Sequence, residues 1–108
     1  MIRRAYTIQL APGAFAEYKE KHDNIWPELV EEFGRQGIAQ LTAFSADPVI
    51  FYYAEVEQED AFDRLFQTAV HDRWALEFKD LIAFDPDGQV SAPFLTEIFH
   101  VEPTVGAR

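Results

Sequence analysis

The stretch IAQLTAFSADPVIFYYAEV, residues 38–56, decides the fold of this chain. It holds two runs of strand-forming residues joined only by Ala-Asp-Pro, and so short a connection predicts a β-hairpin. The second run, VIFYYAEV, is apolar on both faces, with Tyr52 on one face and Phe51 and Tyr53 on the other. A strand of this kind needs cover on both sides. We therefore expect helices on one face of the sheet and another subunit on the other.

The segments on either side of this hairpin alternate between strands and helices. Alternating apolar and polar side chains predict a strand near the N-terminus, and helical periodicity predicts several helices. The expected elements are a strand at 4–10, helices at 14–22 and from 25 to Gly34 or Gly37, strands at 38–45 and 49–56, helices at 57–68 and 71–82, and a strand at 94–101. Asp23 or Asn24 is the expected N-cap of the second helix.

This order of elements predicts an α+β fold, the ferredoxin-like βαββαβ arrangement with one extra helix. Such a fold has a four-stranded antiparallel sheet with its helices on one face. The other face is apolar in this chain, so we expect a two-fold homodimer that buries it. The length of 108 residues fits a single domain, expected over residues 1–103, with a flexible tail at 104–108.

Charge and composition exclude several classes of function. Nine Lys and Arg stand against 19 Asp and Glu, and the net charge of −10 argues against nucleic acid and anionic membranes as partners. Because we find no cysteine, signal peptide or membrane-spanning apolar run, we expect a cytoplasmic protein. The five glycines are scattered, and no His, Asp and Glu have a tight ligand spacing. We therefore expect neither a nucleotide cofactor nor a metal.

The stretch YKEKHDNIWPEL, residues 18–29, points to a functional site. Tyr18 and His22 are four residues apart, so they share one face of a helix. The helical pattern then breaks and resumes at Trp26, beside a proline. One interpretation is that these rings only pack against the sheet. The other is that His22 is a general acid or base at the lip of a pocket, beside aromatic rings that bind a ligand.

Two residues further along the chain also allow two interpretations. Trp74 is either a core residue of its helix or a flat apolar wall for the C–H face of a sugar. Glu97 is a carboxylate in an otherwise apolar strand, and it either faces the sheet edge or accepts hydrogen bonds from ligand hydroxyls. Arg73 is expected at the surface or in a salt bridge.

These residues give the chain a resemblance to the L-rhamnose mutarotase family. The resemblance runs from Met1 to Phe99, and its motifs are Tyr18-x-x-x-His22-x-x-Ile25-Trp26-Pro27-Glu28-Leu29, Arg73-Trp74 and Asp85-Pro86-Asp87. It implies a dimeric α/β barrel of ferredoxin-like subunits that interconverts the α and β anomers of a 6-deoxy-hexose. It also implies that His22 is the catalytic acid, that Tyr18 binds the sugar and that Trp74 lines the site.

The chain departs from the family at two positions. Leu41 stands where the family has a sugar-binding tyrosine, and Ala75 replaces the second of two adjacent tryptophans. Losing a hydroxyl that binds the substrate relaxes or redirects specificity, so the sugar is L-rhamnose, L-fucose or a relative. Tyr52 or Tyr53 is a candidate to replace the lost phenol.

Mutarotation needs an acid for the ring oxygen and a base for the anomeric hydroxyl, with no cofactor. We assign His22 as the proton donor and Tyr18 as its hydroxyl-positioning partner, with Trp26, Trp74 and Glu97 as further substrate-binding candidates. Glu97 and a bound water are candidates for the base. Two alternatives remain at this point: a dimeric ferredoxin-like binding module without catalysis, and a ferredoxin-like monooxygenase acting on aromatic substrates.

Overall fold

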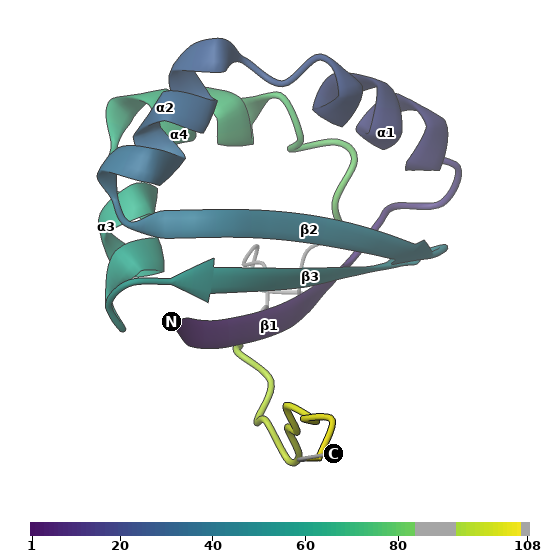
Figure 1. The fold of residues 1–108 in the computed structure, drawn as a ribbon. Helices are drawn as coiled ribbons and strands as arrows, with labels where there is room; N and C mark the ends of the chain where they lie inside the picture. Colours follow the sequence, from purple (N-terminus) through teal and green to yellow (C-terminus); the bar gives the residue numbers. More distant parts are fainter. Residues whose placement is uncertain (84–92, 107–108) are drawn as a thin grey trace.

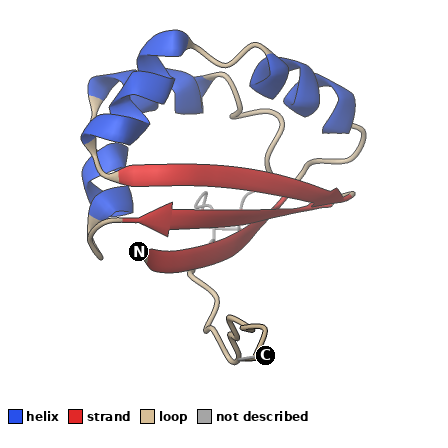
Figure 2. Cartoon of the chain, in the orientation of Figure 1, coloured by secondary structure: helices blue, strands red, loops and turns tan. Residues whose placement is uncertain are grey.

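The computed structural model describes residues 1–83 and 93–106 (Figure 1). Three strands and four helices make up an α+β fold, as the sequence predicts. In chain order they are β1 (Ile2–Gln9), α1 (Phe15–Asp23), α2 (Pro27–Arg35), β2 (Ile38–Ala46), β3 (Val49–Val56), α3 (Ala61–Phe66) and α4 (Ala69–Leu76). The helices lie together on one side of the sheet (Figure 2).

The sheet is antiparallel with the strand order β1-β3-β2, so the hairpin strand β3 is the central one. This confirms the hairpin predicted from residues 38–56. Tyr52 of β3 pairs with Tyr6 of β1 and with Ala43 of β2. Because side chains alternate along a strand, these residues share the face that the helices cover. Tyr52 is therefore held between two strands at the centre of the sheet.

The core fills the space between the sheet and the helices. Leu10, Leu29 and Val56 are its largest fully buried side chains. The opposite face of the sheet carries Phe44 and Phe51, which pair across β2 and β3 and remain 62% and 43% exposed. The predicted contrast between a helix-covered face and an open apolar face is thus present in the single chain.

Helix α2 begins differently from the prediction. Asp23 is the last residue of α1, and Asn24 caps the end of that helix by donating its side-chain amide to the Glu20 carbonyl. Neither residue is the N-cap of α2, because that position belongs to Trp26, with Pro27 as the first helical residue. Proline suits this position because the first turn has no use for its missing N–H. Gly37 follows the helix at φ +81°, a conformation that glycine adopts without strain.

The helices after β3 are shorter than predicted. The helix predicted at 57–68 covers only Ala61–Phe66, and the helix predicted at 71–82 runs instead over Ala69–Leu76. The Thr68 hydroxyl accepts a hydrogen bond from the His71 backbone N–H and so sets the start of α4 earlier. Beyond Leu76 the chain continues as turns that still bury Phe78 and Leu81.

The predicted strand at 94–101 is wrong for this chain. These residues have no regular secondary structure, and Ile98 is 92% exposed. The segment nevertheless lies beside β1, where the Leu95 N–H donates to the Ala5 carbonyl at 2.7 Å. One main-chain hydrogen bond does not make a ladder, so the strand propensity of this segment is not realised. The predicted loop at Asp85-Pro86-Asp87-Gly88 falls outside the described residues.

Candidate functional site

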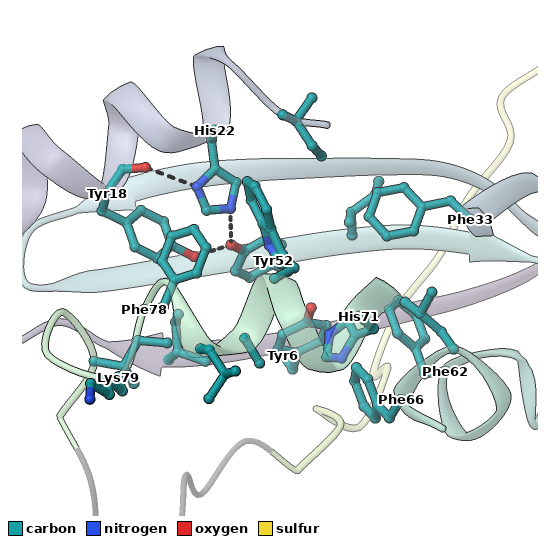
Figure 3. A pocket seen from close by; sticks show the side chains of 18 residues that line it. Tyr6, Tyr18, His22, Phe33, Tyr52, Phe62, Phe66, His71, Phe78 and Lys79 are labelled. Carbon is teal, nitrogen blue, oxygen red and sulfur yellow. Dashed lines mark hydrogen bonds between the residues drawn. The ribbon is translucent and has the colours of Figure 1, made fainter. Parts of the chain in front are cut away.

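A cavity of about 530 Å³ lies between the helix-covered face of the sheet and the helices (Figure 3). Its lining is mainly aromatic and aliphatic, with a few polar side chains, as in small-ligand pockets. The lining residues are Tyr6, Ile8, Tyr18, His22, Ile25, Phe33, Leu41, Tyr52, Phe62, Leu65, Phe66, His71, Trp74, Ala75, Leu76, Phe78, Lys79 and Ile82.

Helix α1 brings Tyr18 and His22 to the cavity one turn apart, as their spacing predicts. Their rings stack with centroids 4.3 Å apart. The His22 Nδ1–H donates to the Tyr18 main-chain carbonyl at 2.9 Å. Nε2 of the same ring lies 3.2 Å from the hydroxyl of Tyr52, which comes from β3. The hydroxyls of Tyr18 and Tyr52 are also hydrogen-bonded to each other (Figure 3).

These contacts fix where the protons are. A carbonyl only accepts hydrogen bonds, so Nδ1 of His22 carries a proton. In the neutral ring Nε2 is then bare, and the Tyr52 hydroxyl donates to it. Because the Tyr52 proton is used in this way, the Tyr18 hydroxyl donates to the Tyr52 oxygen. The result is a directed chain from Tyr18 through Tyr52 to His22.

Burial favours the neutral form of the three hydrogen-bonded side chains, Tyr18, Tyr52 and His22. It lowers the pKa of His22 below its ordinary value, against the opposing effect of the backbone hydrogen bond to Tyr18. It raises the pKa of Tyr18 to about 12. Burial and the neighbouring Tyr18 move the pKa of Tyr52 far above the usual range of a phenol. At neutral pH the site therefore holds an unprotonated Nε2 beside a protonated phenol.

The two tryptophans lie side by side, but only one of them lines the main cavity. Trp74 of α4 is buried and meets the His22 ring edge-on, with centroids 5.5 Å apart. Trp74 is thus a core residue of its helix that also lines the cavity, and its contact with a sugar stays a prediction. Trp26 packs against Trp74 at 5.1 Å and contributes to a separate shallow groove instead. It supports the wall from behind.

Glu97 does not join the other predicted site residues. Its carboxylate forms a salt bridge with Arg3, with 2.5 Å between Oε1 and Nε, and both side chains are partly exposed. Glu97 is not among the residues that line the cavity. Of its two interpretations, the sheet-edge position matches its placement in this chain. Arg73 forms a surface salt bridge with Glu28, as expected.

The cavity lining includes four polar residues that were not predicted as site residues: Tyr6, Tyr52, His71 and Lys79. Tyr52 was noted only as a replacement for a lost phenol, although the alternation of VIFYYAEV already places it on the helix-covered face. His71 of α4 lines the cavity with its ring against Phe66, and burial lowers its pKa. Its distance from His22 in the sequence gave no sign that both histidines line one cavity.

Leu41 and Ala75, the two positions that depart from the family pattern, both line the cavity. Leu41 reaches it from β2, and Ala75 from α4 next to Trp74. The resemblance implies a phenol and an indole at these two places of the cavity surface, where this chain has a leucine and an alanine. Leu41 and Ala75 therefore affect the space for a ligand, while Tyr18 and His22 remain paired on α1.

Comparisons with known proteins identify the relatives of this chain. The sequence profile of the L-rhamnose mutarotase family matches residues 3–101. The L-rhamnose mutarotase of Tolumonas auensis is 32% identical over 103 residues, which cover 94% of this chain and 99% of that protein. The crystal structure of an L-rhamnose mutarotase from Formosa agariphila superimposes with a TM-score of 0.80 at 25% identity, over 94% of this chain and 100% of that one.

A more distant structure supports the fold alone. A dimeric ferredoxin-like protein from an uncultured marine organism has a TM-score of 0.61 at 8% identity, over 92% of this chain and 91% of that one. The fold is therefore ferredoxin-like, as predicted.

None of the helices in residues 1–83 and 93–106 has the length and apolar character to cross a membrane. With its profile match over nearly the whole sequence, the chain belongs to the L-rhamnose mutarotase family.

Proposed function

We propose that this protein interconverts the α and β anomers of L-rhamnose or a closely related 6-deoxy-hexose such as L-fucose. Mutarotases are isomerases, and the family membership supports this class over a binding module or an oxygenase. The cavity supports it independently, because its volume accommodates a pyranose and its aromatic rings offer flat surfaces to the C–H faces of a sugar.

The observation that carries the proposal is the imidazole of His22 at the cavity surface. Nε2 faces a phenol hydroxyl rather than a buried main-chain group, so a sugar hydroxyl can replace that contact. Mutarotation needs a group that both gives and takes a proton near neutral pH, and histidine has this property. We assign His22 as the residue that exchanges protons with the sugar. Tyr18 positions the sugar, and Trp74 is the wall on which the sugar stacks.

We further propose that the protein works as a homodimer that buries the open face of the sheet. Phe44 and Phe51 expose apolar surface there, and isologous pairing of two such faces would cover both at once.

The decisive experiment measures anomer exchange by magnetisation-transfer NMR with L-rhamnose, L-fucose and common D-aldoses. We expect the parent protein to accelerate exchange of at least one 6-deoxy-hexose, and the His22→Ala variant to lose most of that acceleration. His71→Ala is the control, because it removes the other histidine of the cavity. Parent protein that leaves all these sugars at their spontaneous rates contradicts the proposal.

A further inference from the structure

The proposed reaction moves two protons, and His22 accounts for only one of them. Opening the ring adds a proton to the ring oxygen and removes one from the anomeric hydroxyl. Glu97, the side-chain candidate for the second group, is held by Arg3 outside the cavity. Among the described residues, those that line the cavity include no carboxylate. The second proton therefore has to be handled by another imidazole, a phenol or an amine.

Among these groups, Tyr52 is the one in contact with the proton-accepting atom of His22. Its hydroxyl lies 3.2 Å from Nε2 and also bonds to the hydroxyl of Tyr18. The ring of Tyr6 is stacked on that of Tyr52, with centroids 4.9 Å apart, and holds it in place. His71, by contrast, lies against Phe66.

The sheet register gives a second, independent reason. Leu41, where the family has a sugar-binding phenol, pairs with Ala54 of β3. Tyr52 is two residues from Ala54 on the same face, so Leu41 and Tyr52 are diagonal neighbours within reach of a long side chain. A phenol on β3 thus enters the same part of the cavity that a phenol on β2 would enter.

We propose that Tyr52 is the catalytic partner of His22, its hydroxyl giving a proton to the ring oxygen while Nε2 of His22 takes one from the anomeric hydroxyl. This proposal rests on the mutarotase function proposed above. The sugar enters between the two groups and replaces their direct hydrogen bond. Tyr18 then serves Tyr52, because its hydroxyl donates to the oxygen that becomes negative.

The protons and bonds balance over the full cycle. In ring opening the bond between C1 and the ring oxygen breaks and C1 becomes an aldehyde, while Tyr52 loses a proton and His22 gains one. The C1–C2 bond rotates and presents the other face of the aldehyde. In ring closure Tyr52 takes its proton back from the attacking hydroxyl, and His22 protonates the aldehyde oxygen. His22 is the acid in this second half, the role that the family resemblance implies.

The resting protonation states match the start of ring opening, but burial makes Tyr52 a weak acid, so the step depends on the hydrogen bond that Tyr18 donates to its oxygen. Burial keeps Tyr52 protonated and His22 neutral at pH 7, so the acid holds its proton and the base has a free lone pair before the sugar arrives. No rearrangement of protons has to precede ring opening. Tyr52 and His22 are both neutral at the start and at the end of each turnover.

The test is Tyr52→Phe, which keeps the ring and its packing on Tyr6 and removes only the hydroxyl. The matched control is Tyr53→Phe, the same change one residue along β3, on the opposite face of the sheet. We expect Tyr52→Phe to lower kcat for anomer exchange on the order of 10²–10⁴-fold with a smaller change in KM. We expect Tyr53→Phe to stay within about twofold of the parent.

A second measurement separates a chemical role from a structural one. The Tyr52 hydroxyl donates to neutral Nε2 and so stabilises the unprotonated ring. Removing it should raise the pKa of His22, read from the pH dependence of its NMR ring-proton shifts, while the folded spectrum persists. The His22 pKa of Tyr53→Phe should match the parent.

The outcomes separate the two proposals. Parental kcat in Tyr52→Phe, or a loss confined to KM, overturns the catalytic role of Tyr52 and leaves the mutarotase function standing if His22→Ala is impaired. A Tyr52→Phe protein that unfolds is replaced by Tyr52→Leu, which keeps an apolar side chain and has no proton to give; activity at the parental level there also overturns the role of the phenol. Parent protein without any mutarotase activity removes both proposals.

Discussion

Nδ1 of His22 lies 2.9 Å from the main-chain carbonyl oxygen of Tyr18, one helical turn earlier in α1. The helix itself therefore sets the tautomer of the ring and leaves Nε2 to the cavity. The role of Nε2 can be tested with a side chain that keeps the hydrogen bond to the Tyr18 carbonyl and has no atom at the position of Nε2.

The variant His22→Asn retains a donor near the position of Nδ1 and has no atom in place of Nε2. We expect it to fold like the parent, because its amide can donate to the Tyr18 carbonyl, and to lose kcat on the order of 10²–10⁴-fold. Magnetisation-transfer NMR and thermal unfolding measure the two effects. An active His22→Asn protein would show that Nε2 is not the proton-exchanging atom.

Acidification should weaken both activity and stability through the buried histidines. The pKa of His22 is lowered in the folded chain, so between that value and the unfolded value of about 6.5 the unfolded chain binds more protons. The stabilisation is fully present above about pH 6.5 and is lost as the pH falls through the folded pKa. His71 has a lowered pKa for the same reason and adds to the effect.

Urea unfolding at a series of pH values and a pH profile of kcat/KM measure these two consequences. We expect the acid limb of the activity profile to lie below about pH 6.5. The variant His71→Asn should reduce the pH dependence of stability and leave the acid limb of activity in place. An acid limb well above that value contradicts a neutral, buried His22.

The salt bridge between Glu97 and Arg3 predicts that Glu97 is dispensable for the reaction. Glu97→Gln should exchange anomers within about twofold of the parent, because surface substitutions away from a site have small effects. Arg3→Gln, which removes the other partner, is the matched control and should behave alike. A large loss of kcat in Glu97→Gln alone would return the carboxylate to the list of candidate bases.

The cavity surface at Ala75 predicts a change in sugar affinity. Ala75→Trp places an indole next to Trp74, where the resemblance implies one in the family, and adds an apolar surface for the sugar. We expect the KM for L-rhamnose to fall by roughly tenfold, equivalent to about 1.4 kcal/mol, with kcat little changed. Ala75→Leu enlarges the side chain without an aromatic face and serves as the control. An unchanged or higher KM in Ala75→Trp would mean that the sugar does not touch this wall.

The open face of the sheet predicts how the homodimer can be separated. Phe44→Glu combined with Phe51→Glu places like charges in the proposed interface of a chain that already carries a net charge of −10. We expect this variant to have the monomer mass by light scattering, while the parent has the dimer mass. Val30→Glu changes an exposed apolar residue of α2 and should remain dimeric. A dimeric double variant would place the interface elsewhere.

The sequence predicts best those features that depend on local periodicity. The hairpin at residues 38–56 and the pairing of Tyr18 with His22 on one helix face follow from spacing alone, and both are confirmed. The strand at 94–101 was predicted from its apolar residues, yet a strand also needs a partner edge, which the local sequence does not supply. Likewise, Tyr52 contacts His22, and His71 joins the same cavity, only through the packing of separate elements, which no local pattern encodes.

The outer edge of β1 has a consequence for the newly made chain. Among the described residues, this edge accepts main-chain hydrogen bonds only from Ala83 to Gln9 and from Leu95 to Ala5. Within residues 1–83 and 93–106 the rest of this edge has no strand partner, and such an edge is a template on which other chains can add in cross-β stacks. The yield of folded protein after dilution from denaturant should therefore fall as the chain concentration rises, because aggregation through this edge then competes with refolding.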